Sequence, residues 1–336
     1  MIADVVAMGA RSATGLSSLQ IALCARAHMF EPTSLSWRDK RNQPMGMALA
    51  GGLGTQVHGF ERLVGLAAPA LSEALAERGH TPEDRPLPLI VGVARPGRPD
   101  WGPRIAELAG AIGDRAGVAI DEERRAVIAE GQAGFASALL LAKRWLDEGT
   151  PRVAVGGVDS YYHPEVLRWL DEGYRLQAVG AEDGFIPGEG AAFLLLERGG
   201  GLGRVLHAAV AKEETDGRED VPNLASATTG LLHALREQVG EVRWAISDQN
   251  GEGARAREWA LATGRVLGGE IAETKPVWDL GDVGAASGPL FSVLALSSAR
   301  LGFAPHPSCA LVLQSDGPER GVVALESTVE RGETTC

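Results

Sequence analysis

The feature that most constrains the fold is a group of three apolar segments near the middle of the chain. Residues 126–129 and 152–157 have the composition of short strands, and residues 132–146 between them have the length and apolar content of a helix. Neither strand alternates between apolar and polar side chains, so we expect both to be fully buried. Together with 44 glycines, many of them beside short apolar runs, this pattern indicates an α/β protein with tight turns.

The same alternation continues on both sides of this group. Towards the N-terminus we expect a strand, a helix, a polar loop or cap, a second helix and a buried strand, at residues 5–9, 16–28, 31–59, 60–78 and 87–93. Towards the C-terminus we expect strand 205–210, helix 224–239, strand 244–247, helices 254–267 and 285–301, and strands 310–314 and 321–326. Each part ends in an apolar strand, as expected if one unit had been duplicated.

A glycine-rich segment, RGGGLGR at residues 198–204, separates the two parts. Its glycines could form a dinucleotide-binding loop, but they lie between two expected strands rather than between a strand and a helix, so we interpret the segment as a linker. We therefore predict an N-terminal half at residues 1–198 and a C-terminal half at residues 204–336, joined in one compact unit.

Charge and cysteine content limit the classes of partner and cofactor. The net charge of −12 is spread along the chain without a basic block, which disfavours nucleic acid and anionic membranes as partners. Cys24, Cys309 and Cys336 are too few and too scattered for a disulfide framework or a zinc site, so we expect neither a metal nor a cofactor. The N-terminus lacks a basic leader and no apolar run approaches the roughly 20 residues of a membrane span, so we expect a cytoplasmic protein.

Three segments carry a likeness to a known family. The stretch VAVGGVDS (153–160), followed by a helix and DGFIPGEGAA (183–192), is similar to the strand, turn and G-F-x-x-G-E-G-A stretch of the β-ketoacyl synthases. The segment GDVGAASG (281–288) matches the family's G-H-x-x-x-A-A-G helix entrance, and the opening 5–23 is similar to its first strand, turn and helix. The chain thus resembles a β-ketoacyl synthase of the thiolase superfamily, which implies a five-layer αβαβα fold of two related halves, usually dimeric and related to fatty acid or polyketide synthesis.

This resemblance also assigns positions to the family's catalytic side chains, one Cys and two His. At the helix entrance 130–134 the position of the Cys falls on Gln132, and in the loop 247–253 the position of the first His falls on Asn250. The second His falls on Asp282, while Lys275 lies upstream where the family has a lysine, with a slightly longer spacing. A carboxamide cannot form a thioester and an ionised Asp repels an oxyanion, so we expect neither condensation nor decarboxylation.

The family's G-F-G-G-x-N loop is absent from residues 302–310, which leads to a second hypothesis about a nucleophile. Cys309 and His306 would lie near the degenerate site there, so that Cys309 could be a displaced nucleophile with His306 as its base. The alternative, which we favour, is that Cys309 is a small apolar residue entering a strand and His306 is a loop residue between two prolines.

The other polar and aromatic side chains have simpler interpretations. Four acidic residues could converge with Gln132 and Asn250 on a polar or metal-binding pocket, namely Glu130, Asp248, Glu252 and Asp282. Because no paired His ligands accompany them, we favour a hydrogen-bonded cluster. Glu189 is expected to be structural, and Trp259 and Trp278 to anchor the core or a dimer.

Two functions follow from the resemblance. The first is a protein inactive in condensation that acts by protein contact, as a homodimer or as a heterodimer with a Cys-bearing ketosynthase, as in polyketide chain-length factors, which also have Gln at the Cys position. The second is an acyl-thioester-binding protein, acyltransferase or hydrolase with a non-standard site, whose partner would be an acyl carrier protein or a CoA thioester. The acidic net charge disfavours the second, because both of those partners are themselves acidic.

Overall fold

A computed structural model of the chain describes residues 1–79, 85–178, 183–218, 220–268 and 270–328; Cys336 and the end of the expected C-terminal half lie outside these residues. Ten strands form one sheet, in the order β10-β9-β11-β12-β8-β1-β7-β6-β4-β5. The strands are β1 (Ala3–Ser12), β4 (Leu87–Gly92), β5 (Ile120–Ile128), β6 (Arg152–Ser160), β7 (Glu189–Glu197), β8 (Gly203–Lys212), β9 (Trp244–Ser247), β10 (Ala272–Thr274), β11 (Ser308–Gln314) and β12 (Glu319–Ser327).

This sheet is two copies of one five-stranded arrangement. If the strands of each half are numbered in chain order, both halves read first, fifth, fourth, second, third across the sheet. In both halves the fifth strand is antiparallel to its neighbours, whereas the second runs parallel to the third and the fourth. The halves join where residues 3–5 of β1 pair with residues 203–205 of β8. The expectation of two related halves is therefore confirmed, and the glycine-rich segment before β8 connects them.

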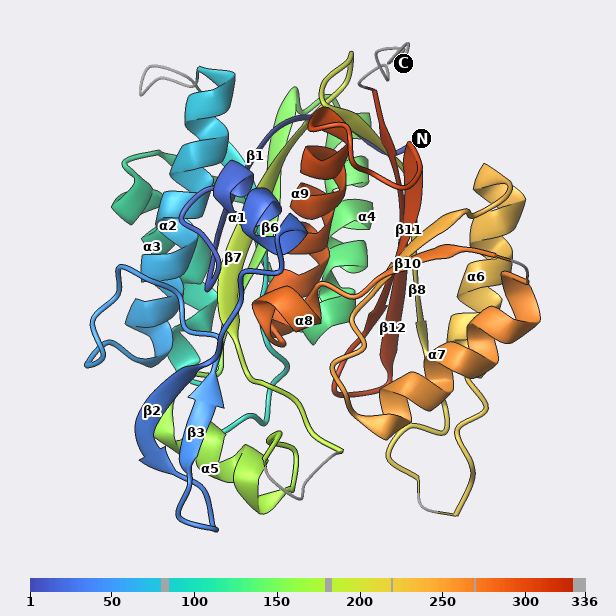
Figure 1. Ribbon diagram of the computed structural model, residues 1–336. Coiled ribbons are helices and arrows are strands. Elements are labelled where there is room, and N and C mark those ends of the chain that lie inside the picture. The colour runs from blue at the N-terminus through green and yellow to red at the C-terminus, as the bar shows by residue number, and fades with distance from the viewer. Residues whose placement is uncertain (80–84, 179–182, 219, 269, 329–336) are drawn as a thin grey trace.

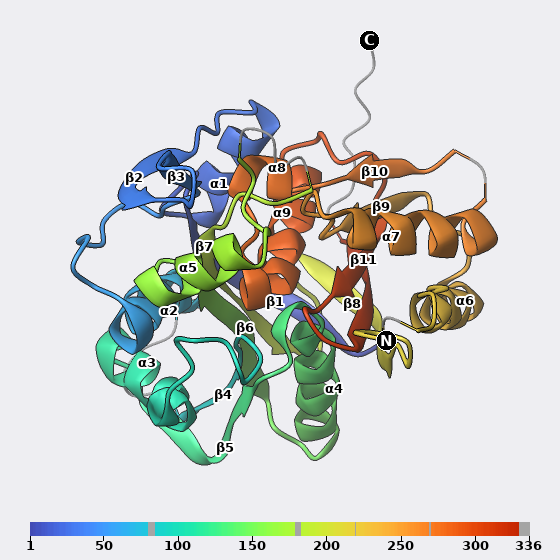
Figure 2. The same ribbon diagram turned by 90° about the horizontal axis from the view of Figure 1, so that it is seen from below.

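Helices complete five layers (Figures 1 and 2). The two central helices, α4 (Gly134–Asp147) and α9 (Ser287–Arg300), lie between the halves of the sheet and contact strands of both. The outer layers are α2 (Gly59–Arg78) with α3 (Leu108–Ala116) over the N-terminal half, and α6 (Ser226–Val239) with α7 (Gly253–Val266) over the C-terminal half. The predicted αβαβα arrangement is confirmed.

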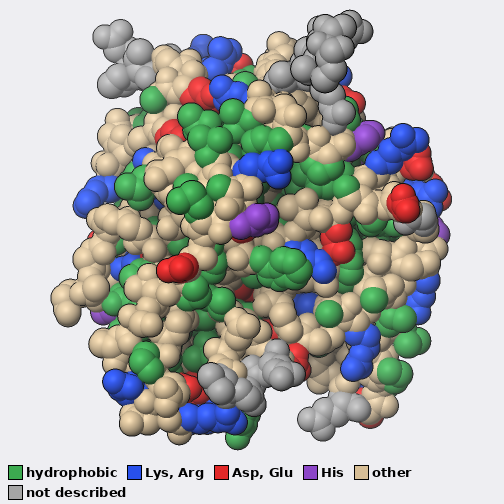
Figure 3. Space-filling view, in the orientation of Figure 1, with side chains coloured by type: hydrophobic (Ala, Val, Ile, Leu, Met, Phe, Trp, Pro, Cys, Tyr) green, Lys and Arg blue, Asp and Glu red, His purple; other side chains and the backbone are tan. Residues whose placement is uncertain are grey.

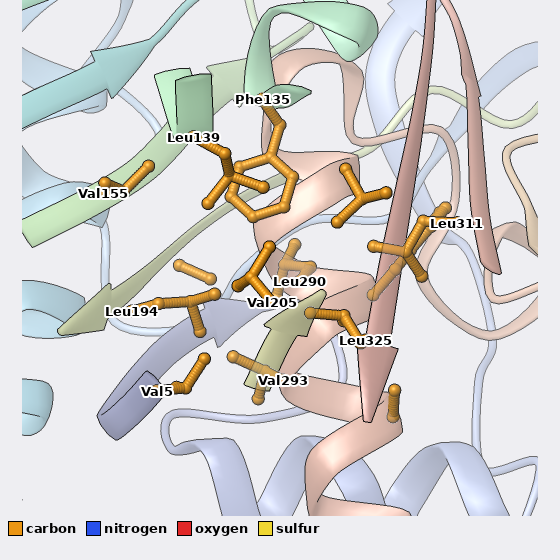
Figure 4. Packing of buried hydrophobic residues seen from close by; sticks show 14 of the residues in the cluster. Val5, Phe135, Leu139, Val155, Leu194, Val205, Leu290, Val293, Leu311 and Leu325 are labelled. Carbon is orange, nitrogen blue, oxygen red and sulfur yellow. The ribbon is translucent and has the colours of Figure 1, made fainter. Parts of the chain in front are cut away.

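The central helix layer carries the main core (Figure 4). Phe135 and Leu139 of α4 and Leu290 of α9 pack between strands of both halves, with Val5 and Leu311 on opposite sides. Burying side chains of this size contributes roughly 1.5–3 kcal/mol each. Helix α9 approaches α4 closely because residue 288 is a glycine, where an added Cβ would stand 2.5 Å from the Cβ of Phe135. This close packing fixes the N-terminal ends of both central helices relative to each other.

Two sequence expectations are corrected by the structure. Residues 31–59 contain a hairpin, β2 (Thr33–Arg38) with β3 (Pro44–Met47), rather than only a loop. Strand β5 is half-buried rather than fully buried, because it is the edge of the sheet and pairs with β4 alone. Sequence periodicity also did not indicate β10 or the short helix α8 (Val277–Leu280), which are too brief to show a period.

Several apolar side chains are exposed around α1 (Ser18–Arg26) and α8. They include Leu19, Leu23 and Trp278, and Figure 3 shows hydrophobic side chains on this face. Trp278 is 69% exposed, so it is not a core residue, whereas Trp259 packs against the outer core of the C-terminal half. One further helix, α5 (Pro164–Glu172), lies near β2 and β3 (Figure 2). Within the described residues no helix is long and apolar enough to cross a membrane.

Candidate functional site

Matching turns at the starts of the two central helices form the site. The 3-10 turn Gly131–Ala133 precedes α4, the 3-10 turn Gly284–Ala286 precedes α9, and the two turns contact each other. Each turn begins with a glycine at positive φ, 67° for Gly131 and 52° for Gly284, a conformation that other residues adopt only under strain. Gln132 therefore lies at the first turn of α4, opposite the segment that carries Asp282.

Asn250 and Asp282 bind each other. Asn250 follows β9, and its Nδ2 donates to Asp282 Oδ2 at 2.7 Å and to Glu252 Oε2 at 3.0 Å. Asp282 Oδ1 accepts from the backbone N–H of Gly284 at 2.8 Å. Burial raises the pKa of Asp282, with Arg255 acting in the opposite direction. The structure thus brings together two of the three residues that the resemblance assigns to catalytic positions, and both hydrogens of the Asn250 amide are in use.

An acidic and arginine network continues from this pair. Arg175 contacts Glu252 at 2.6 Å and Asp316 at 3.0 Å, while Arg255 contacts Asp316 at 2.8 Å and Asp248 at 3.3 Å. The two arginines help to hold the pKa values of Glu252 and Asp316 below their usual range, against desolvation. Desolvation dominates at Asp248, whose pKa it raises to about 7.

The carboxylates of this network contact arginine side chains. In the part of the chain that the structure describes, no group of three or more His, Cys, Asp or Glu side chains is placed to hold a metal ion. Glu130 is separate from the network, since its carboxylate accepts from Ser137 Oγ. Asp248, Glu252 and Asp282 are thus held by hydrogen bonds and ion pairs in one network, and Glu130 is held elsewhere.

Gln132 lines a cavity next to this network. The residue is 2% exposed, and its Nε2 has no hydrogen-bond partner. The cavity, of about 210 Å³, is lined by Ala94, Arg95, Pro96, Gly97, Arg98, Gly131, Gln132, Asp159, Tyr161, Trp169 and Asp316. Arg98 reaches into it and contacts Asp159 and Asp100, both at 2.7 Å.

The connection between β11 and β12, rather than residues 302–310, contacts the turn that holds Gln132. Ser315 Oγ accepts from the backbone N–H of Ala133 at 2.9 Å and donates to the carbonyl of Glu130. Cys309 and His306 lie at the opposite end of β11, so the structure corrects their expected position near Gln132. The Cys309 thiol is buried, which raises its pKa, and His306 Nδ1 contacts Ser308 Oγ at 3.1 Å.

Two more expected residues have defined surroundings. Lys275 Nζ lies 3.4 Å from Glu273 Oε1 and 5.4 Å from the centre of the Trp278 ring. Glu189 is fully buried and makes two contacts with Arg62, at 2.5 and 2.6 Å, while also accepting from Ser160 Oγ at 2.6 Å. Its role is structural, as the sequence indicated.

Several residues of the site were not found from the sequence. Asp316 follows β11 as Asp248 follows β9, and since these strands are parallel neighbours their carboxyl ends meet at one edge; that pattern was a usable signal. Arg98 stands in the RPGRPDWG loop, after the strand at residues 87–92. Nothing in the local sequence indicated that Arg175, beyond α5, reaches Glu252.

Comparison with known proteins gives evidence that is independent of the geometry of the site. No family model matches the chain. A Streptomyces coelicolor protein named actinorhodin polyketide putative beta-ketoacyl synthase 2 is 31% identical over 205 residues, which are 53% of this chain and 48% of that protein. The match therefore spans about half the length of this relative.

Solved structures match over nearly the whole chain. The ishigamide ketosynthase/chain length factor has a TM-score of 0.74 at 18% identity, covering 97% of this chain and 99% of that one. The oxazolomycin ketosynthase domain KS7 of Streptomyces albus gives 0.78 at 16% identity, over 98% and 75%. A type II PKS acyl-carrier protein in complex with its ketosynthase bound to the hexaketide gives 0.78 at 13% identity, over 97% and 99%. With its duplicated strand order and paired helix entrances, the chain has the thiolase-like fold of these ketosynthase structures.

Proposed function

We propose that this chain does not catalyse condensation and acts by contact with another protein, as a homodimer or as a partner of a related ketosynthase. The observation that carries the proposal is Gln132 at the first turn of α4. At this place a helix dipole stabilises a thiolate, and a ketosynthase needs its nucleophile there. A carboxamide is not a nucleophile and forms no thioester.

The surroundings support the loss of decarboxylation as well. Stabilising an enolate needs free donors aimed at its oxygen. Asn250 uses both amide hydrogens on Glu252 and Asp282, and a carboxylate at Asp282 would repel the developing charge. Asn250 and Asp282 thus stabilise each other instead of a reacting group.

The edge of the sheet offers a surface for the partner. Among the described residues, strand β5 pairs on one side only, with β4. Residues 121–124 bulge out of this pairing, since Leu87 pairs with Ile120 and Leu89 with Arg125, so the regular edge is residues 125–128. The opposite edge, β10, has three residues. The open side of residues 125–128 is a template for an antiparallel copy of the same strand. Among the similar structures, one is named for a ketosynthase/chain length factor.

Association is tested by sedimentation velocity of the purified chain, alone and after co-expression with a Cys-bearing ketosynthase. We expect a dimer in at least one of these preparations. Ala126→Lys and Val127→Lys should each weaken a homodimer that forms through this edge, because a charged side chain on an edge strand opposes pairing with another chain. Arg243→Glu, on an exposed loop of the other half, is the matched control. A monomer in both preparations would contradict the proposal.

A second candidate function, binding of an acyl thioester without covalent transfer, is supported by the cavity at Gln132. Isothermal titration calorimetry with acetyl-CoA and with an acyl-loaded carrier protein tests it. Saturable binding that free CoA does not reproduce would favour this candidate. Equal heats for acetyl-CoA and CoA would exclude it.

A further inference from the structure

The cavity beside Gln132 has more unpaired hydrogen-bond donors than unpaired acceptors, and this difference indicates which kind of ligand fits it. Both of its carboxylates are already paired. Asp159 accepts at one oxygen from Arg98 and the backbone of Ser160, and at the other from the backbone of Ala285. Asp316 accepts from Arg175 at both oxygens, and from Arg255 at one of them. Each carboxylate thus accepts three hydrogen bonds of about four possible, which leaves a ligand few acceptors for its own hydrogens.

Among the described residues, in contrast, two side chains of the cavity have donors to spare. Nε2 of buried Gln132 has no partner. The guanidinium of Arg95 has an ion pair at Nε, with Glu319 at 2.9 Å, and four further N–H groups. This guanidinium lies against Gly317, where an added Cβ would stand 2.0 Å from Nη1, so it is held flat at the cavity wall. Burial raises the pKa of Tyr161 well above its usual value, so that phenol also remains protonated.

The walls limit the size and charge of what can bind. About 210 Å³ accommodates a small molecule but not a long acyl chain, and Trp169 and Pro96 supply apolar surface. Because two carboxylates line the cavity, a dianion would be repelled even though both are paired. A guanidinium and an amide N–H together are complementary to one planar carboxylate group.

We propose that this cavity binds a short monocarboxylate, with Arg95 and Gln132 donating to its oxygens and its apolar tail against Trp169. Such a ligand forms no covalent bond and needs neither a thiol nor a partner chain. The inference is thus separate from the proposed function. The chain can fail to bind a carboxylate and still pair with a ketosynthase, and it can bind a carboxylate without pairing with a ketosynthase.

Isothermal titration calorimetry of the full chain with propionate tests the proposal, with propionamide as a neutral probe of the same shape and inorganic phosphate as a dianion. We expect saturable binding of propionate and at least tenfold weaker binding of the other two. Gln132→Met and Arg95→Gln should each weaken propionate about tenfold or more, a change of about 1.4 kcal/mol. Arg124→Gln, in a separate groove near the start of β4, should bind as the unsubstituted chain does.

Three results would overturn the proposal. They are no saturable heat with propionate, equal affinity for propionamide or phosphate, and equal affinity of the two cavity variants and the Arg124→Gln control. Thermal unfolding of each variant checks the fold. Gln132→Met decides if Arg95→Gln does not fold, because the Gln132 side chain makes no hydrogen bond through Nε2 that its loss would break.

Discussion

Glu189 and Arg62 form an ion pair in the interior of the N-terminal half. Both side chains are fully buried and held by two contacts, so each charge depends on the other. Glu189→Gln would leave the guanidinium without its counter-charge, and we expect a loss of about 3–5 kcal/mol in the free energy of unfolding. Denaturant unfolding measures this loss. Glu241→Gln, in an exposed pair with Arg243, is the control and should change stability by less than about 1 kcal/mol.

Asp248 gives a prediction about pH. Its pKa is about 7 in the folded chain, against about 3.9 in an unfolded one, so between these values the folded chain binds more protons than the unfolded one. Its contribution to stability is present below the lower value and is lost as pH rises through about 7. Relative to Asp248→Asn, which cannot titrate, the unsubstituted chain should lose about 1.4 kcal/mol per pH unit across this window.

Urea unfolding of both proteins between about pH 4.5 and about pH 8.5, a range that covers most of this window, measures that difference. The carboxamide of the Asp248→Asn variant can still accept from the backbone N–H of Gln314, as the Asp248 carboxylate does at 2.6 Å, so the fold should be kept. A stability difference that does not change with pH would show that Asp248 is ionised throughout.

The residues of the site were only partly predictable. Gln132, Asn250 and Asp282 were located because each lies in a short motif at the end of a strand or the start of a helix. Arg175 and Arg98 were not, because a long flexible side chain reaches its partner across the fold and leaves no local pattern. Cys309 was misplaced by one strand length, since the sequence alone did not show which end of β11 faces the site.

At the scale of elements, the two 3-10 turns offer a matched comparison. Both Gly131→Ala and Gly284→Ala place a Cβ at positive φ, which costs about 1–2 kcal/mol. At Gly284 the new Cβ would also stand 2.0 Å from Asp159 Oδ2, whereas at Gly131 its nearest neighbour is Ser315 Oγ at 3.3 Å. We expect Gly284→Ala to lose at least about 2 kcal/mol more than Gly131→Ala in thermal or denaturant unfolding. Equal losses would mean that Asp159 moves aside freely.

Most elements were predictable because their periodicity is strong, and the failures have physical causes. Helices α4 and α9 are rich in apolar residues along most of their length, which is why both were predicted as helices. Strand β5 was expected to be buried because only its apolar end, residues 126–129, has the composition of a strand. Its first residues are charged and lie at the sheet edge, a property set by tertiary pairing rather than by local sequence.

At the scale of the whole molecule, duplication explains where the site lies. Each half contributes one central helix, and the N-terminal turns of these helices meet between the halves (Figure 1). The C-terminal half also supplies Asn250 and Arg255, while the N-terminal half supplies Arg98 and Arg175. Side chains of both halves therefore pack together in this network.

Intact-mass spectrometry after incubation with acetyl and malonyl thioesters, on CoA and on a carrier protein, tests the absence of a nucleophile most directly. We expect no acyl adduct on the unsubstituted chain. Gln132→Cys, which places a thiol at the first turn of α4, should gain one adduct that hydroxylamine removes. An adduct on the unsubstituted chain, at Cys309 or elsewhere, would contradict the proposal that this ketosynthase-like protein does not catalyse condensation.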